Sequence, residues 1–399
     1  MRLFLLSLLF TIHVHAISPQ DFGAAGDAQK VEDAVLNGTT IVTSATAAFA
    51  PGDVGKTVYG IENITGVSYL PRGLILSVDS PTQITTSVAA ISGATGIKLV
   101  WGRDDSDAVI AAKNAAQAQK KKLNIPAGGY LVRKRILGVS YPALTRAFPV
   151  EGDGSGITTF YICPDFDYTT CGPWEVLIGG NMANAYGAKW SGFTIDGCGA
   201  TFTHPGGGTN DLFYPIAGSS HSCIDDVRIQ NFKNVGCAMK MLGNCLMTRC
   251  HVEDAGNVGI AWIGEGTALH NYVGNVNGVA LRITNVTTNG PFKWLGGIVD
   301  ESAAPNGVEV DNSVDVHFIG AQIYSGIGRV AVRVDATSEV RLTASQLSPY
   351  GAHWGTALKI LPGGRAGLSN TRLRGVAPGV ALDGSTGVQA DYIEGEVTP

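Results

Sequence analysis

Charged side chains are scarce in this sequence. Asp, Glu, Lys and Arg make up 15% of the 399 residues, whereas they form about a quarter of an average soluble protein. Together with a hydrophobic content of 45%, this scarcity argues against a disordered chain and against a coiled coil. The formal net charge is −5 and no block of basic residues occurs, so we expect no nucleic-acid partner.

Long uninterrupted helical segments are also missing, because glycine and proline punctuate the chain. The 53 glycines and 17 prolines form about 18% of the residues, against roughly 12% in average usage. Many short strands joined by turns fit this composition better than a helical bundle.

Beyond its N-terminus the sequence has no apolar run that approaches the roughly 20 residues of a membrane span. Residues 1–16 are typical of a secretory signal peptide, with Arg2 before an apolar stretch and Ala16 at the cleavage position. We therefore expect a mature chain that starts near Ile17, is secreted or periplasmic, and contacts no membrane after signal cleavage. A retained N-terminal anchor is the alternative.

No Cys-x-x-Cys motif occurs, which argues against a zinc or thiol-redox site. All seven cysteines lie between Cys163 and Cys250, and their odd number leaves at least one thiol unpaired. In an exported chain, Cys163 with Cys171 is the first disulfide to test. Cys237 and Cys250 fall in strand-like runs and are equally well explained as buried small side chains.

An internal repeat dominates the second half of the sequence. One phrase, a glycine followed by alternating apolar residues, returns about every 24 residues, and Arg329 fills one gap in the series. It starts at Gly236, Gly259, Gly278, Gly307, Gly355 and Gly379. The central apolar residues of a second phrase, which runs in step with the first, are Ile195, Ile229, Val252, Val273, Ile298, Ile323, Leu347 and Leu373.

A period in the twenties with two or three short strands per repeat is typical of a parallel β-solenoid. A propeller blade needs about 40 residues, and a leucine-rich repeat needs its Leu/Asn consensus. We therefore predict an all-β fold, a right-handed parallel β-helix. The open end of such a solenoid must be covered by another element. Residues 107–122 predict a helix that caps it. We expect the N-cap of this helix among residues 104–106 and lysines 120–122 at its C-terminal end.

Three segments near the N-terminus carry a resemblance to a known superfamily. They read DFGAAGD at 21–27, DDSDAVI at 104–110 and IPAGGY at 125–130. Together with the repeats, they resemble the pectate-lyase-like (pectin-lyase-fold) superfamily of secreted polysaccharide-active enzymes and phage tailspikes. The resemblance implies that residues 17–27 start a β-helix domain, that 28–100 form a small β-rich insertion, and that 101–399 form the β-helix itself.

The resemblance is specific for the fold and weak for the reaction, because the superfamily is understood to include hydrolases, lyases, epimerases and non-catalytic binders. Of the catalytic phrases of its polygalacturonase branch, only an Asp-Asp pair is matched, by Asp225 and Asp226, and no Gly-His-Gly occurs. The chain is therefore not assigned as a polygalacturonase.

Strand alternation predicts which side chains of the coils point outward. If Phe193, Ile195, Val227, Ile229 and Val252 face the core, their neighbours form a polar outer face in the middle of the solenoid. We expect candidate substrate contacts there at Arg228, Arg249, His251, His270 and Tyr272.

Asp196 and Glu253 are the predicted catalytic acid/base pair. Each follows the central apolar residue of its coil, two coils apart, so we expect a separation of about 9 to 10 Å from a spacing of about 4.8 Å per coil. An inverting glycosidase has its carboxyl groups about 6.5 to 9.5 Å apart. Asp226 is the reserve carboxylate, displaced along the strand toward Arg249 and His270.

Two other interpretations of the same face stay open. In a lyase, carboxylates hold Ca²⁺ against an acidic sugar and Arg228, Arg249 or His251 removes the C5 proton. In a non-catalytic glycan-binding or adhesive protein, the charged residues include cross-strand ion pairs that contribute little individually. The turn residues Asn231, Asp254 and Asn275 are interpreted as structural.

The sequence thus predicts a polysaccharide-active protein, with glycoside hydrolysis placed ahead of lyase chemistry and glycan binding. The partner is a polysaccharide substrate, and a homotrimer stays open as an assembly. No organic cofactor or resident metal is expected, apart from Ca²⁺ if the protein is a lyase.

Overall fold

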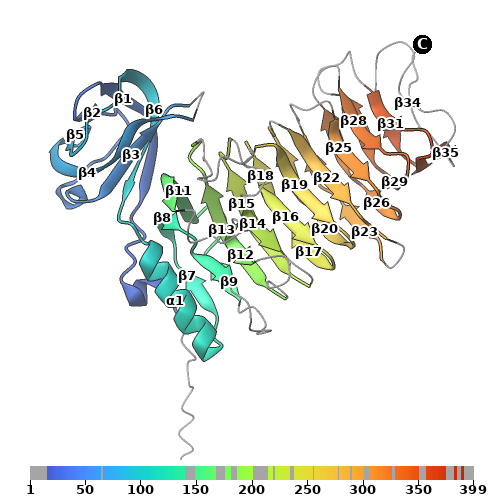
Figure 1. The fold of residues 1–399 in the computed structure, drawn as a ribbon, viewed down its shortest axis with the longest axis horizontal. Coiled ribbons are helices and arrows are strands. Elements are labelled where there is room, and N and C mark those ends of the chain that lie inside the picture. The colour runs from blue at the N-terminus through green and yellow to red at the C-terminus, as the bar shows by residue number, and fades with distance from the viewer. Residues whose placement is uncertain are drawn as a thin grey trace, which may run out of the picture.

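The computed structural model of the chain consists almost entirely of β-strands, with one α-helix among the residues that it describes (Figure 1). The predicted signal peptide lies outside the described residues except for Ala16. In the described part of the chain, no helix is long and apolar enough to span a membrane. The described residues are 16–63, 66–139, 149–167, 176–180, 187–200, 214–218, 221–233, 238–254, 256–276, 278–287, 290–300, 306–325, 329–349, 356–373, 382–383 and 388–390.

A small closed barrel precedes the coils and lies at the same end of the solenoid as the α-helix (Figure 1). Its strands pair antiparallel in the order β1-β2-β5-β4-β3-β6. The barrel has a core of its own, in which the rings of Phe49 and Trp101 lie 4.8 Å apart. Its strands are β1 (Gln29–Asn37), β2 (Ile41–Thr43), β3 (Thr57–Ile61), β4 (Ser68–Ser80), β5 (Gln83–Thr86) and β6 (Gly93–Gly102).

The coils form two parallel sheets that enclose the main core, so the predicted parallel β-helix is confirmed. The long sheet has 19 strands within the described residues, and most coils contribute two of them. They are β7 (Leu123–Ile125), β8 (Gly128–Lys134), β10 (Val150–Gly152), β11 (Thr158–Asp167), β13 (Lys189–Asp196), β15 (Cys223–Gln230), β17 (Cys245–Thr248), β18 (His251–Glu253), β20 (Gly266–Leu269), β21 (Tyr272–Gly274), β23 (Phe292–Leu295), β24 (Ile298–Val299), β26 (Val316–Ile319), β27 (Gln322–Ser325), β29 (Glu339–Thr343), β30 (Gln346–Pro349), β32 (Arg365–Ser369), β33 (Arg372–Leu373) and β35 (Val388–Ala390).

The short sheet has ten strands in the described residues and contains the glycine-led phrase. They are β9 (Leu137–Val139), β12 (Val176–Gly180), β14 (Tyr214–Gly218), β16 (Met239–Leu242), β19 (Val258–Ile263), β22 (Val279–Thr284), β25 (Asn306–Asp311), β28 (Val330–Val334), β31 (Thr356–Ile360) and β34 (Leu382–Asp383). The glycines of successive phrases do not all pair with each other. Gly259 and Gly307 each lie opposite Ala280, two residues beyond the glycine of the phrase between them. A shift of two leaves the same side chains facing the core.

The predicted inward positions of the central coils are confirmed. Phe193, Ile195, Val227, Ile229 and Val252 are fully buried. Ile298 is the exception, because it pairs with Tyr272 on the outer face while Val299 takes the core position opposite Val273. Both residues are β-branched and apolar, so composition does not distinguish them, and a one-residue slip reverses the face.

Each coil bends sharply between its two long-sheet strands at a residue with left-handed backbone. Arg249 has φ 52° and His270 has φ 51°, and the next coils have Gly296 and Gly320 there. A second left-handed position follows the core residue by two, at Asn231, Asp254 and Asn275, so their turn role is confirmed. Asn and Asp tolerate this conformation better than most residues.

The helix α1 (Ser106–Gln119) covers the open end of the first coil with Val109, Ala112 and Ala116. It lies next to the 3₁₀ turn η1 (Pro19–Phe22); a second such turn, η2 (Pro51–Asp53), belongs to the barrel segment. Lysines 120–122 lie at the C-terminal end of the helix as predicted, but the last helical residue is Gln119, because Lys120 is the C-cap with left-handed backbone, φ 52°.

The aromatic core of the middle coils contains two tryptophans. Trp262 and Trp294 are fully buried. The ring of Trp262 lies 4.9 Å from that of Phe292, which in turn lies 6.5 Å from Phe318. These tryptophans stabilise the stacking of coils and are not available to stack on a sugar, and Trp354 lies outside the described residues.

The cysteines in the described part of the chain are free thiols at Cys163, Cys198, Cys223, Cys245 and Cys250. Cys250 is buried, as its strand-like context predicts. Cys171 and Cys237 lie outside the described residues, so a pairing of Cys163 with Cys171 stays a prediction.

Asp105 connects the N-terminal segment to the cap. It is the N-cap residue of α1, within the predicted range 104–106, but its side chain makes no capping hydrogen bond. Its carboxylate instead accepts hydrogen bonds from the backbone N–H groups of Ala25 (2.7 Å) and Gly26 (3.0 Å). Burial raises the pKa of this carboxyl, the two N–H groups act against that rise, and the result is a pKa of about 6.

Asp105→Asn is expected to change how stability depends on pH. A carboxyl whose folded pKa is raised binds its proton more tightly in the folded chain, so its stabilising contribution is present in acid and is lost as pH rises toward 6. The melting temperature of the natural chain relative to Asp105→Asn should therefore rise as pH falls from about 7 to about 5. A difference that stays constant between thermal melts at those two pH values would contradict this role.

Candidate functional site

The outer face of the middle coils brings four of the predicted residues together as the central cluster, defined as Arg228, His251, Glu253 and Tyr272. Arg228 on β15 pairs with His251 on β18, which pairs with Tyr272 on β21. Glu253 follows His251 by two residues, so both side chains leave the same face of β18. Three neighbouring coils therefore build the cluster.

Both oxygens of the Glu253 carboxylate are bound. Arg228 donates from its Nη2 to Oε1, and Nε2 of His251 lies 2.9 Å from Oε2. Burial alone would raise the pKa of Glu253, but the hydrogen bonds and charges of Arg228 and His251 lower it below its usual value. Glu253 is thus an ionised carboxylate that orients the imidazole of His251.

The ring of Tyr272 stacks on the imidazole of His251, with centroids 4.3 Å apart and planes 29° apart. Its hydroxyl extends over Gly274, where a Cβ would stand only 2.4 Å from the Tyr272 Oη. The absence of a side chain at Gly274 therefore makes room for the tyrosine next to Glu253, whose register partner is Gly274.

The bend residues form a second row beside the central cluster. The strand register places Asp226, Arg249 and His270 at the same bend on three successive coils, each with left-handed backbone. His270 lies over the next coil, because a Cβ at Gly296 would stand 2.7 Å from its Nδ1. The predicted displacement of Asp226 toward Arg249 and His270 thus agrees with the register.

Two neighbouring carboxylates on β15 are engaged by protein groups. Asp226 accepts hydrogen bonds from the backbone N–H (3.2 Å) and the hydroxyl (2.7 Å) of Ser155. Asp225 accepts from Arg249, with Nη2 at 2.5 Å and Nε at 3.1 Å, a bidentate ion pair on the exposed face. Sequence reasoning missed the Asp225–Arg249 pair, although their register positions on adjacent coils could have indicated it.

Asp196 is not open to solvent, and this corrects its placement on the solvated outer face. Its side chain is 1% exposed, because Lys30 on barrel strand β1 covers it, with Nζ 2.9 Å from Oδ2. Gln230 (2.8 Å), Asn231 (2.9 Å) and the backbone N–H of Cys198 (2.7 Å) donate to the same carboxylate. The alternation of apolar and polar residues correctly predicted the position of Asp196 on its strand. It did not indicate that the barrel lies over this coil.

The register of the predicted acid/base pair is confirmed, whereas its catalytic role stays a prediction. Asp196 pairs with Gln230, and Gln230 pairs with Glu253, so the two carboxylates stand two coils apart. At about 4.8 Å per coil their backbones are about 10 Å apart. The side chain of Gln230 occupies the position between them and bonds to Asp196.

Chemically, the central cluster combines a fixed cation, an oriented imidazole and a phenol at the surface, with one ionised carboxylate beneath them. Such a set suits the binding of an anionic group and proton transfer next to it. Among the described residues, no group of three or more His, Cys, Asp or Glu side chains is placed to hold a metal ion. A Ca²⁺ requirement therefore stays a prediction tied to the lyase interpretation.

No family model matches the chain, and no curated protein matches it. Solved structures resemble it at low identity. The mannuronan C-5 epimerase AlgE4 A-module from Azotobacter vinelandii is 12% identical, with 73% of this chain and 95% of that one covered and a TM-score of 0.42. ORF18 of Geobacillus virus E2 is also 12% identical, with 73% and 57% covered and a TM-score of 0.47.

A third similar structure is the catalytic domain of a GH87 α-1,3-glucanase in complex with nigerose. It is 10% identical, with 92% of this chain and 89% of that one covered and a TM-score of 0.35. The chain therefore has distant structural similarity to polysaccharide-active proteins of this fold. At these scores the similarity carries no argument about the reaction, so the function must be argued from the chain's own residues.

Proposed function

We propose that the protein is exported and cleaves an acidic polysaccharide by removing the C5 proton of a uronic acid residue. The observation that carries this proposal is the position of His251, which is hydrogen-bonded to Glu253 and stacked on Tyr272. Arg228 binds the other oxygen of the same carboxylate and supplies a cation beside the imidazole.

The hydrogen bond with Glu253 sets the tautomer of His251 that can act as a base. Because Glu253 is ionised, the Nε2 atom of His251 donates its proton to that carboxylate. The other ring nitrogen, Nδ1, then carries the lone pair in the neutral imidazole. A carboxylate that orients a histidine in this way also stabilises the imidazolium that forms after proton removal.

Arg228 is placed to bind the sugar carboxylate. A guanidinium has five N–H donors, so its bond to Glu253 leaves others for a substrate anion. Binding the carboxylate there makes the adjacent C5 proton more acidic, because negative charge that develops during its removal is stabilised by the cation.

The bond changes balance without an added reactant. Nδ1 of His251 takes the C5 proton, the C5–H electrons form the C4–C5 double bond, and the C4–O bond breaks. The leaving oxygen takes the hydroxyl proton of Tyr272, whose ring stacks on the base. The proton on His251 returns to Tyr272 through solvent, and the product carries an unsaturated uronic acid at its new end.

Hydrolysis by Asp196 and Glu253, which sequence reasoning placed first, is less well supported by this geometry. Asp196 is buried beneath Lys30, and Glu253 has a lowered pKa, so neither is placed as a carboxylic acid that protonates a leaving oxygen. The reserve carboxylate Asp226 is bound by Ser155.

The proposal is tested by incubating the purified mature chain with acidic and neutral polysaccharides, with Ca²⁺ and with a chelator. Reducing ends and the ultraviolet absorbance of the unsaturated product are followed together. Both signals on a uronic-acid polymer are the expected result. Reducing ends without absorbance would move the assignment to hydrolysis, and silence on every polymer with binding intact would make the protein a glycan binder.

Gly274→Ala is expected to lower turnover about tenfold, because the added Cβ displaces the Tyr272 ring and loses its positioning against His251. The backbone of Gly274 needs no left-handed conformation, so the fold should be retained. Gly52→Ala is the matched control, since a Cβ there meets nothing within 4 Å. Equal turnover of the two variants on the same polymer would refute the role of Tyr272.

A further inference from the structure

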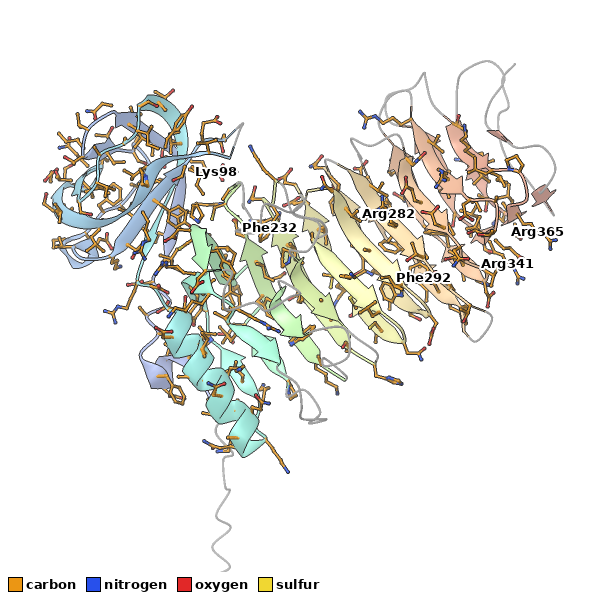
Figure 2. The ribbon with its side chains drawn as sticks, viewed as in Figure 1. Lys98, Phe232, Arg282, Phe292, Arg341 and Arg365 are labelled. Carbon is orange, nitrogen blue, oxygen red and sulfur yellow. The ribbon has the colours of Figure 1, made fainter. Side chains whose placement is uncertain are left out.

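A row of basic side chains lies on the outer face of the coils that follow the central cluster. Strand pairing places Lys293 on β23 opposite His317 on β26, and His317 opposite Arg341 on β29. Successive rungs of such a ladder are about 4.8 Å apart. Arg365, which Figure 2 labels near the C-terminal end of the solenoid, stands opposite Glu339 in the strand register.

The charges of this row are only partly compensated. Arg341 bonds to Glu339 on its own strand at 3.2 Å, and His317 bonds to Asp315 at 2.6 Å. Within the described residues, Lys293 has no ion-pair partner. Lys293 is therefore a cation that an anion lying along the row can bind.

An apolar row runs beside the basic one on the same strands. Leu269, Leu295 and Ile319 occupy successive rungs, and the last two stand two residues after Lys293 and His317. Ile319 is 38% exposed, and on the next strand Thr343 takes this position beside Arg341. Outward apolar side chains next to cations form a surface that suits a ligand with both apolar faces and anionic groups. Sugar rings with carboxylate substituents have this combination.

We propose that Lys293, His317 and Arg341 form a binding strip for an acidic polysaccharide that lies along the solenoid axis. The basic side chains of the strip bind the carboxylates of the polymer, and the apolar row contacts its sugar rings. This inference rests on the proposed function for the class of ligand, and it adds a binding surface that begins on the coil next to that of Tyr272. The strip would hold the polymer while one of its residues is bound at Arg228.

The strip is tested by calorimetric titration of the full mature chain with polygalacturonate, and with its fully methyl-esterified form as the uncharged probe. Lys293→Gln and Arg341→Gln should each weaken binding of the charged polymer about fivefold, roughly the size of one partly exposed ion pair. Added salt should reduce this difference. Binding of the esterified polymer should change little.

Lys359→Gln is the matched control, because it removes one positive charge from the short sheet at a strand position opposite Arg333. It should leave the affinity unchanged. Equal affinities of the natural chain and both strip variants would overturn the strip, and so would equal losses in all three variants, which would indicate only the net charge. Binding of double-stranded DNA in preference to polygalacturonate would overturn the ligand class.

The experiments can refute the proposed lyase function and the binding strip independently of each other. Absence of turnover on every polymer, with charge-dependent binding that is lost in Lys293→Gln, would retain the strip and refute the lyase. Turnover that depends on His251, with unchanged binding in the strip variants, would refute the strip and retain the lyase.

Discussion

Lys30→Met is expected to lower the free energy of unfolding by about 3 to 5 kcal/mol, the usual cost of leaving a buried charge without its partner. Asp196 is 1% exposed and loses in this variant the only cation that contacts it among the described residues. Burial alone would lower the pKa of Lys30, but the charge and hydrogen bond of Asp196 raise it above its usual value. The pair therefore stays ionised across the physiological range.

The double variant Lys30→Met with Asp196→Leu should recover most of the loss, because apolar residues often replace a buried ion pair without cost. Lys134→Met is the control, since its partner Asp107 is 82% exposed and such a pair contributes at most about 1 kcal/mol. Urea unfolding followed by tryptophan fluorescence measures all three. A loss below that of the control would mean that the hydrogen bonds of Gln230, Asn231 and Cys198 suffice for Asp196.

Sequence periodicity predicts the solenoid well because its physical constraint is local. A parallel coil must return a small apolar residue to the same place in each turn, so positions such as Ile229 and Val252 are visible without a structure. The periodicity does not predict which residue faces the core where two apolar residues are adjacent. Ile298 and Val299 are equivalent in composition, and only the pairing with the neighbouring coils selects Val299 for the core.

The candidate site is harder to predict, because contacts between distant segments determine it. The alternation places Asp196 and Glu253 at the correct register positions, but the exposure of Asp196 depends on Lys30, which is 166 residues away in the chain. The barrel makes further contacts of this kind, such as the hydroxyl of Tyr59 with the carbonyl of Ile162 at 3.2 Å. No pattern in the coils indicates where an inserted domain will lie.

His251→Asn is expected to reduce kcat on a uronic-acid polymer by about 100-fold or more, because general-base catalysis commonly contributes a factor of that size. The affinity for the polymer should change little, since Arg228 still binds the carboxylate. Glu253→Gln should reduce kcat as well, because a neutral amide no longer stabilises the imidazolium or fixes its tautomer. Steady-state kinetics on one polymer separates kcat from KM.

His221→Asn is the matched control, an exposed histidine with left-handed backbone just before β15. Its turnover should equal that of the natural chain. The pH profile adds a readout that a merely structural role would not change. In the natural chain kcat/KM should rise with pH, as expected of a reaction that needs an unprotonated base, and this rise should be absent from the residual activity of His251→Asn. If that variant kept both the rise and the turnover, His251 would be an aromatic contact for the sugar, and the base would have to be found elsewhere on the outer face.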